Sequence, residues 1–143
     1  MAKGSKKRQA EAPTSDCILL CEDVLESKGR GKHMLQGVIN IITVQNLPAV
    51  IGPLVAYVRM RNVYSRQRLH FSLGLLEKEQ DGEILSFDLD SPDNSDPLGQ
   101  HTLIIAVPPF PVEQEGRYVF TASHNGEAFA QTIFALRSYK REE

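Results

Sequence analysis

The stretch from Gln67 to Lys78 reads QRLHFSLGLLEK, and its alternation of apolar and polar side chains decides the fold class. Apolar side chains occupy every second position, namely Leu69, Phe71, Leu73 and Leu75. Polar side chains stand between them, namely Arg68, His70 and Ser72. Successive side chains of a β-strand point to opposite faces, so this pattern predicts a strand with one face in the core and one in solvent.

The same two-residue period recurs from Cys17 to Arg137, and no segment shows the sustained period of an amphipathic helix. We expect eight strands, over Cys17–Val24, His33–Val44, Leu54–Arg61, Gln67–Lys78, Glu83–Leu89, Thr102–Val107, Arg117–Ser123 and Ala128–Arg137. Asn125-Gly126 between the last two is the strongest hairpin signal. Short hairpin links cannot supply the crossovers that parallel strands need. The sequence therefore predicts an all-β fold, an antiparallel β-sandwich of seven to eight strands that is immunoglobulin-like in broad architecture.

The length of 143 residues fits one domain with its own hydrophobic core. We expect a disordered basic tail over residues 1–15, a β-sandwich domain over residues 16–137 and a charged C-terminal tail over residues 138–143. The apolar runs are too short to span a bilayer, and no apolar segment of a secretory signal follows the basic start. We therefore expect a cytoplasmic protein.

The charged residues exclude some classes of function. The 16 lysine and arginine residues and the 18 aspartate and glutamate residues leave a net charge of −2, which excludes a globally basic nucleic-acid-binding protein. The chain also lacks the serine-hydrolase elbow, the zinc-protease helix and the phosphate-binding loop. We therefore expect a binding protein with no catalytic residue and no cofactor.

Basic side chains next to a tyrosine form the first candidate binding site. They occupy the polar faces of two consecutive strands, so pairing of those strands would bring them to one exposed face. The candidate residues are Tyr57, Arg59, Arg61, Arg68 and His70. Guanidinium groups bind carboxylates and phosphates through paired hydrogen bonds, so such a face fits an anionic partner. The alternative is an ordinary charged face that keeps the sheet soluble.

Spaced carboxylates in one acidic segment form the second candidate site. They are Asp88, Asp90, Asp93 and Asp96. Calcium prefers about six to eight oxygen ligands, and an acidic loop supplies several. The segment lacks the glycine and the closing glutamate of an EF-hand loop. The alternative is a solvated loop interrupted by proline.

Several different short motifs follow one another along the chain. They are Leu19-Leu20-Cys21-Glu22-Asp23-Val24, Leu35-Gln36-Gly37-Val38, Asn46-Leu47-Pro48-Ala49, Tyr57, Gly116-Arg117-Tyr118-Val119-Phe120 and Asn125-Gly126. This order resembles an uncharacterised family of small bacterial β-sandwich domains of unknown function, over residues 16–136. The resemblance implies a β-sandwich and a bacterial source, and it brings no activity, cofactor or catalytic residue.

Two residues of these motifs carry structural expectations of their own. Gly37 inside a strand indicates a bulge or the close approach of another stretch of backbone. Tyr118 near the start of its strand is expected to bond a backbone carbonyl at the corner of the sandwich.

The combined interpretation is a non-catalytic binding module. We expect it to engage a protein or an anionic partner, and not nucleic acid or a membrane. Self-association through opposed basic and acidic surfaces, giving a homo-oligomer, is a second mode of binding. A calcium-dependent module or a small enzyme that uses the segment from Asp88 to Asp96 is the alternative from a different class.

Overall fold

The computed structural model of the chain describes residues 12–26, 32–91, 96 and 99–139. Eleven strands and one 3₁₀ helix lie in this part of the chain. Their bounds are β1 (Thr14–Glu26), β2 (His33–Val38), β3 (Ile41–Val44), β4 (Ala49–Ile51), β5 (Leu54–Arg61), β6 (Arg68–Leu75), η1 (Leu76–Gly82), β7 (Glu83–Asp90), β8 (His101–Val107), β9 (Phe110–Val112), β10 (Gly116–His124) and β11 (Glu127–Ser138).

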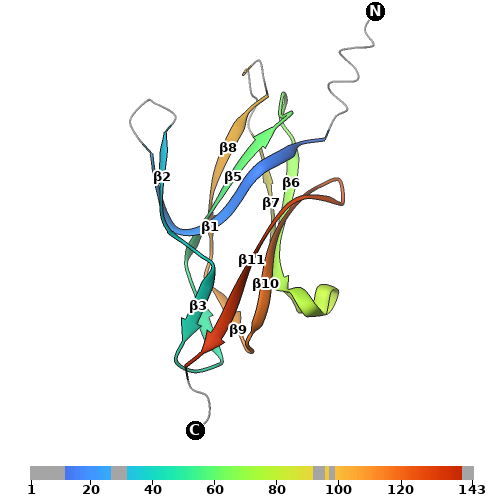
Figure 1. Cartoon of the computed structure of the whole chain (residues 1–143). Helices are drawn as coiled ribbons and strands as arrows, with labels where there is room; N and C mark the ends of the chain where they lie inside the picture. Colours follow the sequence, from blue (N-terminus) through green and yellow to red (C-terminus); the bar gives the residue numbers. More distant parts are fainter. Residues whose placement is uncertain (1–11, 27–31, 92–95, 97–98, 140–143) are drawn as a thin grey trace, which may run out of the picture.

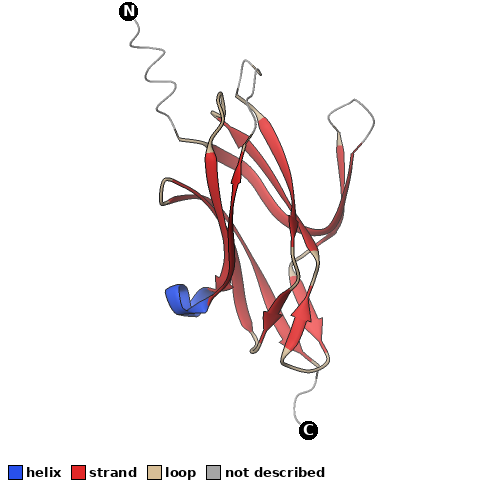
Figure 2. Ribbon diagram, turned by 180° about the vertical axis from the view of Figure 1, so that it is seen from behind, coloured by secondary structure: helices blue, strands red, loops and turns tan. Residues whose placement is uncertain are grey.

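Most of these strands belong to two sheets (Figure 1). Sheet A has the strand order β2-β1-β5-β8, and sheet B has the order β3-β11-β10-β6-β7. Strands β4 and β9 form a separate two-stranded ladder. Buried side chains from all three sheets join one hydrophobic cluster, so the core lies between the sheets. The fold is all-β, and Figure 2 shows η1 as the one helical element of the described residues.

The alternation in β6 places the core as the sequence predicts. The apolar set of β6 is buried, and Arg68 and His70 on the other face are exposed. The Phe71 ring stacks on Phe87 of β7 and Phe120 of β10, with ring centroids 5.6 and 5.9 Å apart. Burying one such side chain contributes about 1.5–3 kcal/mol, so these rings fix the register of three neighbouring strands.

The corner before β10 is also as expected. The Tyr118 hydroxyl donates a hydrogen bond of 2.6 Å to the carbonyl oxygen of Gln114, four residues upstream. The Tyr118 ring is buried and stacks on Phe134 of β11, with centroids 5.6 Å apart. This arrangement anchors the entry to β10 against the core. The hairpin at Asn125-Gly126 is confirmed as well, with both residues at positive φ.

The segment expected as one strand over His33–Val44 is two strands in different sheets. β2 ends at Val38 and pairs with β1 in sheet A, whereas β3 begins at Ile41 and pairs in parallel with β11 in sheet B. Backbone hydrogen bonds hold the crossing, since the Ile39 amide donates to the Leu20 carbonyl and the Ala135 amide donates to the Asn40 carbonyl. The two short strands follow each other closely and are both rich in apolar residues, so the sequence alone gives the pattern of a single strand.

Other boundaries differ in smaller ways. Leu76 to Lys78, expected in a strand, belong to η1. Two of the segments between the expected strands contain the short strands β4 and β9, which pair with each other. β1 begins at Thr14 and β11 ends at Ser138, so strands extend into both expected tails. Residues 1–11 and 140–143 lie outside the described residues. In the described ranges, no helix is long and apolar enough to cross a membrane.

Candidate functional site

The basic residues of the two consecutive strands lie on opposite sides of the molecule. Arg59 and Arg61 are on β5 in sheet A, whereas Arg68 and His70 are on β6 in sheet B. Both pairs are exposed on the outer faces of their sheets. The expectation of a single basic face is therefore wrong, because the chain changes sheets between β5 and β6. Buried Val63 lies in that connection, and its amide donates to the Gly99 carbonyl.

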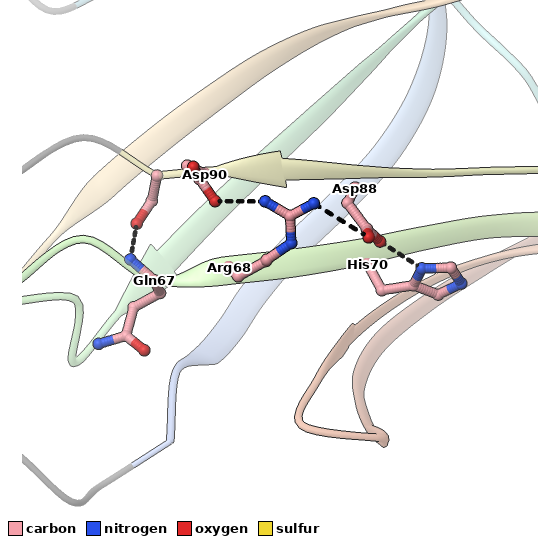
Figure 3. Close-up of polar contacts among 6 residues, drawn as sticks. Gln67, Arg68, His70, Asp88 and Asp90 are labelled. Carbon is pink, nitrogen blue, oxygen red and sulfur yellow. Dashed lines mark hydrogen bonds and ion pairs between the residues drawn. The ribbon is translucent and has the colours of Figure 1, made fainter.

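On sheet B, the basic residues contact acidic residues of the next strand (Figure 3). His70 Nδ1 lies 2.6 Å from Asp88 Oδ1, and the Arg68 guanidinium lies 3.4 Å from Asp88 Oδ2 and 3.2 Å from Asp90 Oδ1. The hydrogen bond with His70, together with the charges of His70 and Arg68, lowers the pKa of Asp88 below its usual range. In this set of four side chains, the sheet B network, each basic side chain contacts at least one carboxylate.

The acidic candidate residues do not gather on one loop. Asp88 and Asp90 belong to β7, and Asp96 Oδ2 accepts a hydrogen bond of 2.9 Å from the Gln100 amide. Asp93 lies outside the described residues. Among the side chains that the structure describes, no group of three or more His, Cys, Asp or Glu residues could hold a metal ion. Calcium binding stays a prediction, and two of its four carboxylates contact Arg68.

On sheet A, the β1–β2 hairpin folds back over the outer face. Leu19 pairs with Tyr57, and Glu26, seven residues further along β1, pairs with His33. In a flat sheet those seven residues would separate His33 from Tyr57 by about 24 Å along the strand. Their ring centroids are instead 5.3 Å apart, so β1 bends sharply, as Figure 1 shows.

Gly37 lies at this bend. Its φ is +64°, a conformation that favours glycine. The Glu22 side chain lies where a Cβ atom of residue 37 would be placed. The expectation of a bulge or a close backbone at Gly37 is therefore wrong, because the close neighbour is a side chain and the β1–β2 register has no shift. The absent side chain at position 37 lets the hairpin curl.

Residues of the folded hairpin, of β5 and around the start of β8 line a polar pocket of about 310 Å³. Its lining residues are His33, Tyr57, Arg59, Met60, Arg61, Gln100, His101 and Thr102. Tyr57 is only 9% exposed although it alternates with the outward arginines, because His33 covers it. The Tyr57 hydroxyl lies 3.4 Å from His33 Nδ1. The pocket thus holds three of the five basic-site residues.

The basic side chains that line the pocket differ in whether an acidic side chain contacts them. Arg61 forms an ion pair of 2.9 Å with Asp16. The Arg59 guanidinium has no ion pair or hydrogen bond in the part of the chain that the structure describes. Burial lowers the pKa of His101, which lies in the same pocket. Arg59 therefore presents a cation without a counter-ion among the described residues.

Sequence reasoning missed His33, His101 and Thr102 as pocket residues. Thr102 pairs with Arg59 across β5 and β8, a register that no local pattern gives. His33 reaches the pocket only because β1 bends. The glycine at position 37 was the one available signal for that bend.

A family model described as a family of unknown function (DUF6941) matches residues 16–137. The chain belongs to this family. The resemblance seen in the sequence is thereby confirmed, and the DUF6941 description assigns no activity to any residue of the pocket.

No curated protein matches the chain. Among solved structures, the alkylpurine DNA glycosylase AlkC of Pseudomonas fluorescens, bound to DNA containing an abasic site analog, aligns at 12% sequence identity and a TM-score of 0.37. The alignment covers 85% of this chain and 30% of that chain, so this chain spans less than a third of that protein. A likeness at that score carries no argument about function.

Proposed function

We propose that this chain is a non-catalytic binding module that holds an anionic group of its partner in the pocket on sheet A. The guanidinium of Arg59, which has no ion pair or hydrogen bond within the described ranges and lines a polar pocket, carries the proposal. A guanidinium recognises a carboxylate or a phosphate through paired hydrogen bonds. The proposal includes a bacterial, cytoplasmic setting, and the free thiols of Cys17 and Cys21 suit a reducing compartment.

The neighbouring side chains support an anion beside Arg59. The hydroxyl groups of Tyr57 and Thr102 line the same pocket and supply neutral hydrogen-bond donors. His101 becomes a further cation when it takes up a proton. Burial lowers the pKa of His101, whereas a bound anion would favour the protonated ring. We therefore expect anion binding to strengthen as the pH falls and His101 takes up its proton.

The test is a calorimetric titration of the full chain with inorganic phosphate. We expect Arg59→Gln to weaken phosphate binding by roughly 10- to 100-fold, since hydrogen bonds to a charged group contribute about 1.5–3 kcal/mol. Arg68→Gln is the matched control, because Arg68 is an exposed arginine on the opposite sheet that already contacts two carboxylates. Equal affinity in the wild type and Arg59→Gln, or an equal loss in both variants, would refute the proposal.

A further inference from the structure

β8 is an edge strand of sheet A. It pairs with β5 along its whole length without a register shift, and no strand pairs with its other edge in the described ranges. Its sequence, from His101 to Val107, is HTLIIAV, with no aspartate, glutamate, lysine or arginine. Such an edge presents backbone N–H and C=O groups that are free to accept a further strand.

The other three edge strands of sheets A and B carry features that oppose strand addition. β7 contains Glu83, Asp88 and Asp90, and its pairing with β6 has a register irregularity. β3 has only four residues. β2 is interrupted by the positive φ of Gly37. β8 is therefore the edge that combines length, regularity and an uncharged sequence.

The position of Arg59 indicates what kind of strand would fit. Arg59 lies opposite Thr102, so its side chain projects from the outer face beside β8. A strand added to β8 would lie two strand spacings from β5, about 10 Å away. An extended arginine and an extended glutamate span that distance. Acidic side chains on the outer face of the added strand would thus meet Arg59.

The inner face of the added strand has a different environment. Leu103 is half-buried and Ile105 is buried, and both point toward the core. The alternate residues of an added strand would lie beside them, where apolar side chains fit. Charge and polarity therefore favour a segment that alternates acidic and apolar residues. A second copy of β8 fits less well, because it brings another cationic outer face and no carboxylate of its own strand.

We propose that β8 binds an extended acidic segment of a partner protein as an added strand of sheet A, with an acidic side chain on Arg59. This inference rests on the proposed function and names the class of partner. Backbone hydrogen bonds along β8 supply affinity, and the alternate side chains supply specificity, as in other cases of strand addition.

The test uses a synthetic peptide of the length of β8, acetyl-Glu-Val-Glu-Val-Glu-Val-Glu-amide, and the full-length chain labelled with ¹⁵N. We expect peptide binding to shift the amide signals of β8 and to slow amide exchange along its free edge. A peptide with Lys in place of Glu, and a peptide with N-methylated backbone amides, should each bind at least about tenfold more weakly.

Variants of the protein provide a matched comparison. Ile104 is 42% exposed on edge strand β8, and Ile133 is 47% exposed on β11, an interior strand of sheet B. Ile104→Glu should weaken peptide binding at least about tenfold by charge repulsion, and Ile133→Glu should leave it unchanged. Both positions are exposed, so both variants should keep the fold.

The outcomes separate this inference from the proposed function. Equal binding of the N-methylated peptide, signals that shift along β2 or β7 instead, or binding of phosphate without binding of the peptide would overturn strand addition and leave the anion pocket standing. Concentration-dependent self-association through β8 without peptide would show that a second copy is the occupant, and would also overturn it. Failure of both phosphate and peptide to bind would overturn both proposals.

Discussion

The outer faces of the two sheets carry similar side chains in different surroundings. β5 presents Arg59 and Arg61 two residues apart, and β6 presents Arg68 and His70 with the same spacing. Strand β7 places Asp90 opposite Arg68 and Asp88 opposite His70. The strands beside β5 place Cys17 and Thr102 opposite Arg59. The residue opposite on the neighbouring strand, and not the strand's own sequence, therefore decides whether a basic side chain already contacts a carboxylate.

The shape of the two faces differs for a related reason. The β1–β2 hairpin bends over sheet A and covers Tyr57, which encloses the pocket around Arg59. The sheet B network instead lies between two neighbouring strands, with its side chains about half exposed. A cation at a pocket, with no counter-ion among the described residues, favours binding a ligand, whereas an exposed ion pair contributes only a little stability.

The largest expected effect comes from removing the bend on sheet A with Gly37→Val. A branched side chain at positive φ costs about 1–2 kcal/mol, and it also displaces the Glu22 side chain. We expect lower stability in urea, loss of the His33 ring-current shift from Tyr57, and weaker phosphate binding.

Gly126→Val is the matched control for that variant. Gly126 also has a positive φ, at +84°, but nothing lies within 4 Å of where its Cβ would be placed. It should lose similar stability and keep both the His33 signal and phosphate binding. If Gly37→Val kept them as well, the bend would not depend on the glycine.

Local alternation predicted much of the fold. It assigned the buried face of β6 correctly, because burial on one face leaves a two-residue period in the sequence. The corner formed by Tyr118 and the hairpin at Asn125-Gly126 were also foreseen, since both depend on residues close together in the chain. These features share a short-range physical cause.

The candidate site was predicted only in part, because it depends on long-range pairing. Alternation shows that Arg59 and Arg68 face solvent, but it does not show that they belong to different sheets. The turn between β5 and β6 looks like a hairpin link and is a crossing between layers. Thr102 lies beside Arg59 because of the register between β5 and β8, and His33 lies at the same pocket because β1 bends. The local sequence around Thr102 or His33 predicts neither arrangement.

A smaller expected effect is a difference in folding stability between the variants Arg68→Gln and Arg59→Gln. Arg68→Gln should lower the free energy of unfolding slightly, because it leaves Asp88 and Asp90 without their shared guanidinium. Arg59→Gln should cause no such loss. The difference, measured by urea unfolding, should vanish in about 1 M salt, where the Debye length is about 3 Å. A loss in Arg59→Gln equal to that in Arg68→Gln would mean that Arg59 has a stabilising partner after all.

The smallest effect concerns the pH dependence of the sheet B network. The pKa of Asp88 is lowered by its hydrogen bond to His70 and by nearby positive charge. Such a carboxyl group stabilises the fold above its unfolded pKa, and this contribution is lost as the pH falls through its folded pKa. The wild type should therefore be more stable than Asp88→Asn at neutral pH. In urea unfolding the gap should begin to close below about pH 4 and vanish only below the lowered pKa of Asp88.

Arg59→Gln should leave that acid dependence unchanged, because Arg59 lies on the other sheet and contacts no carboxylate that the structure describes. The Glu77–Arg117 pair also lowers a carboxyl pKa, but it is present in all three proteins and cancels from the comparison. A gap between wild type and Asp88→Asn that persisted at low pH would assign the Asp88 contribution to packing rather than charge. The two faces would then differ in shape alone, and the lack of a counter-ion for Arg59 among the described residues would no longer distinguish it from Arg68.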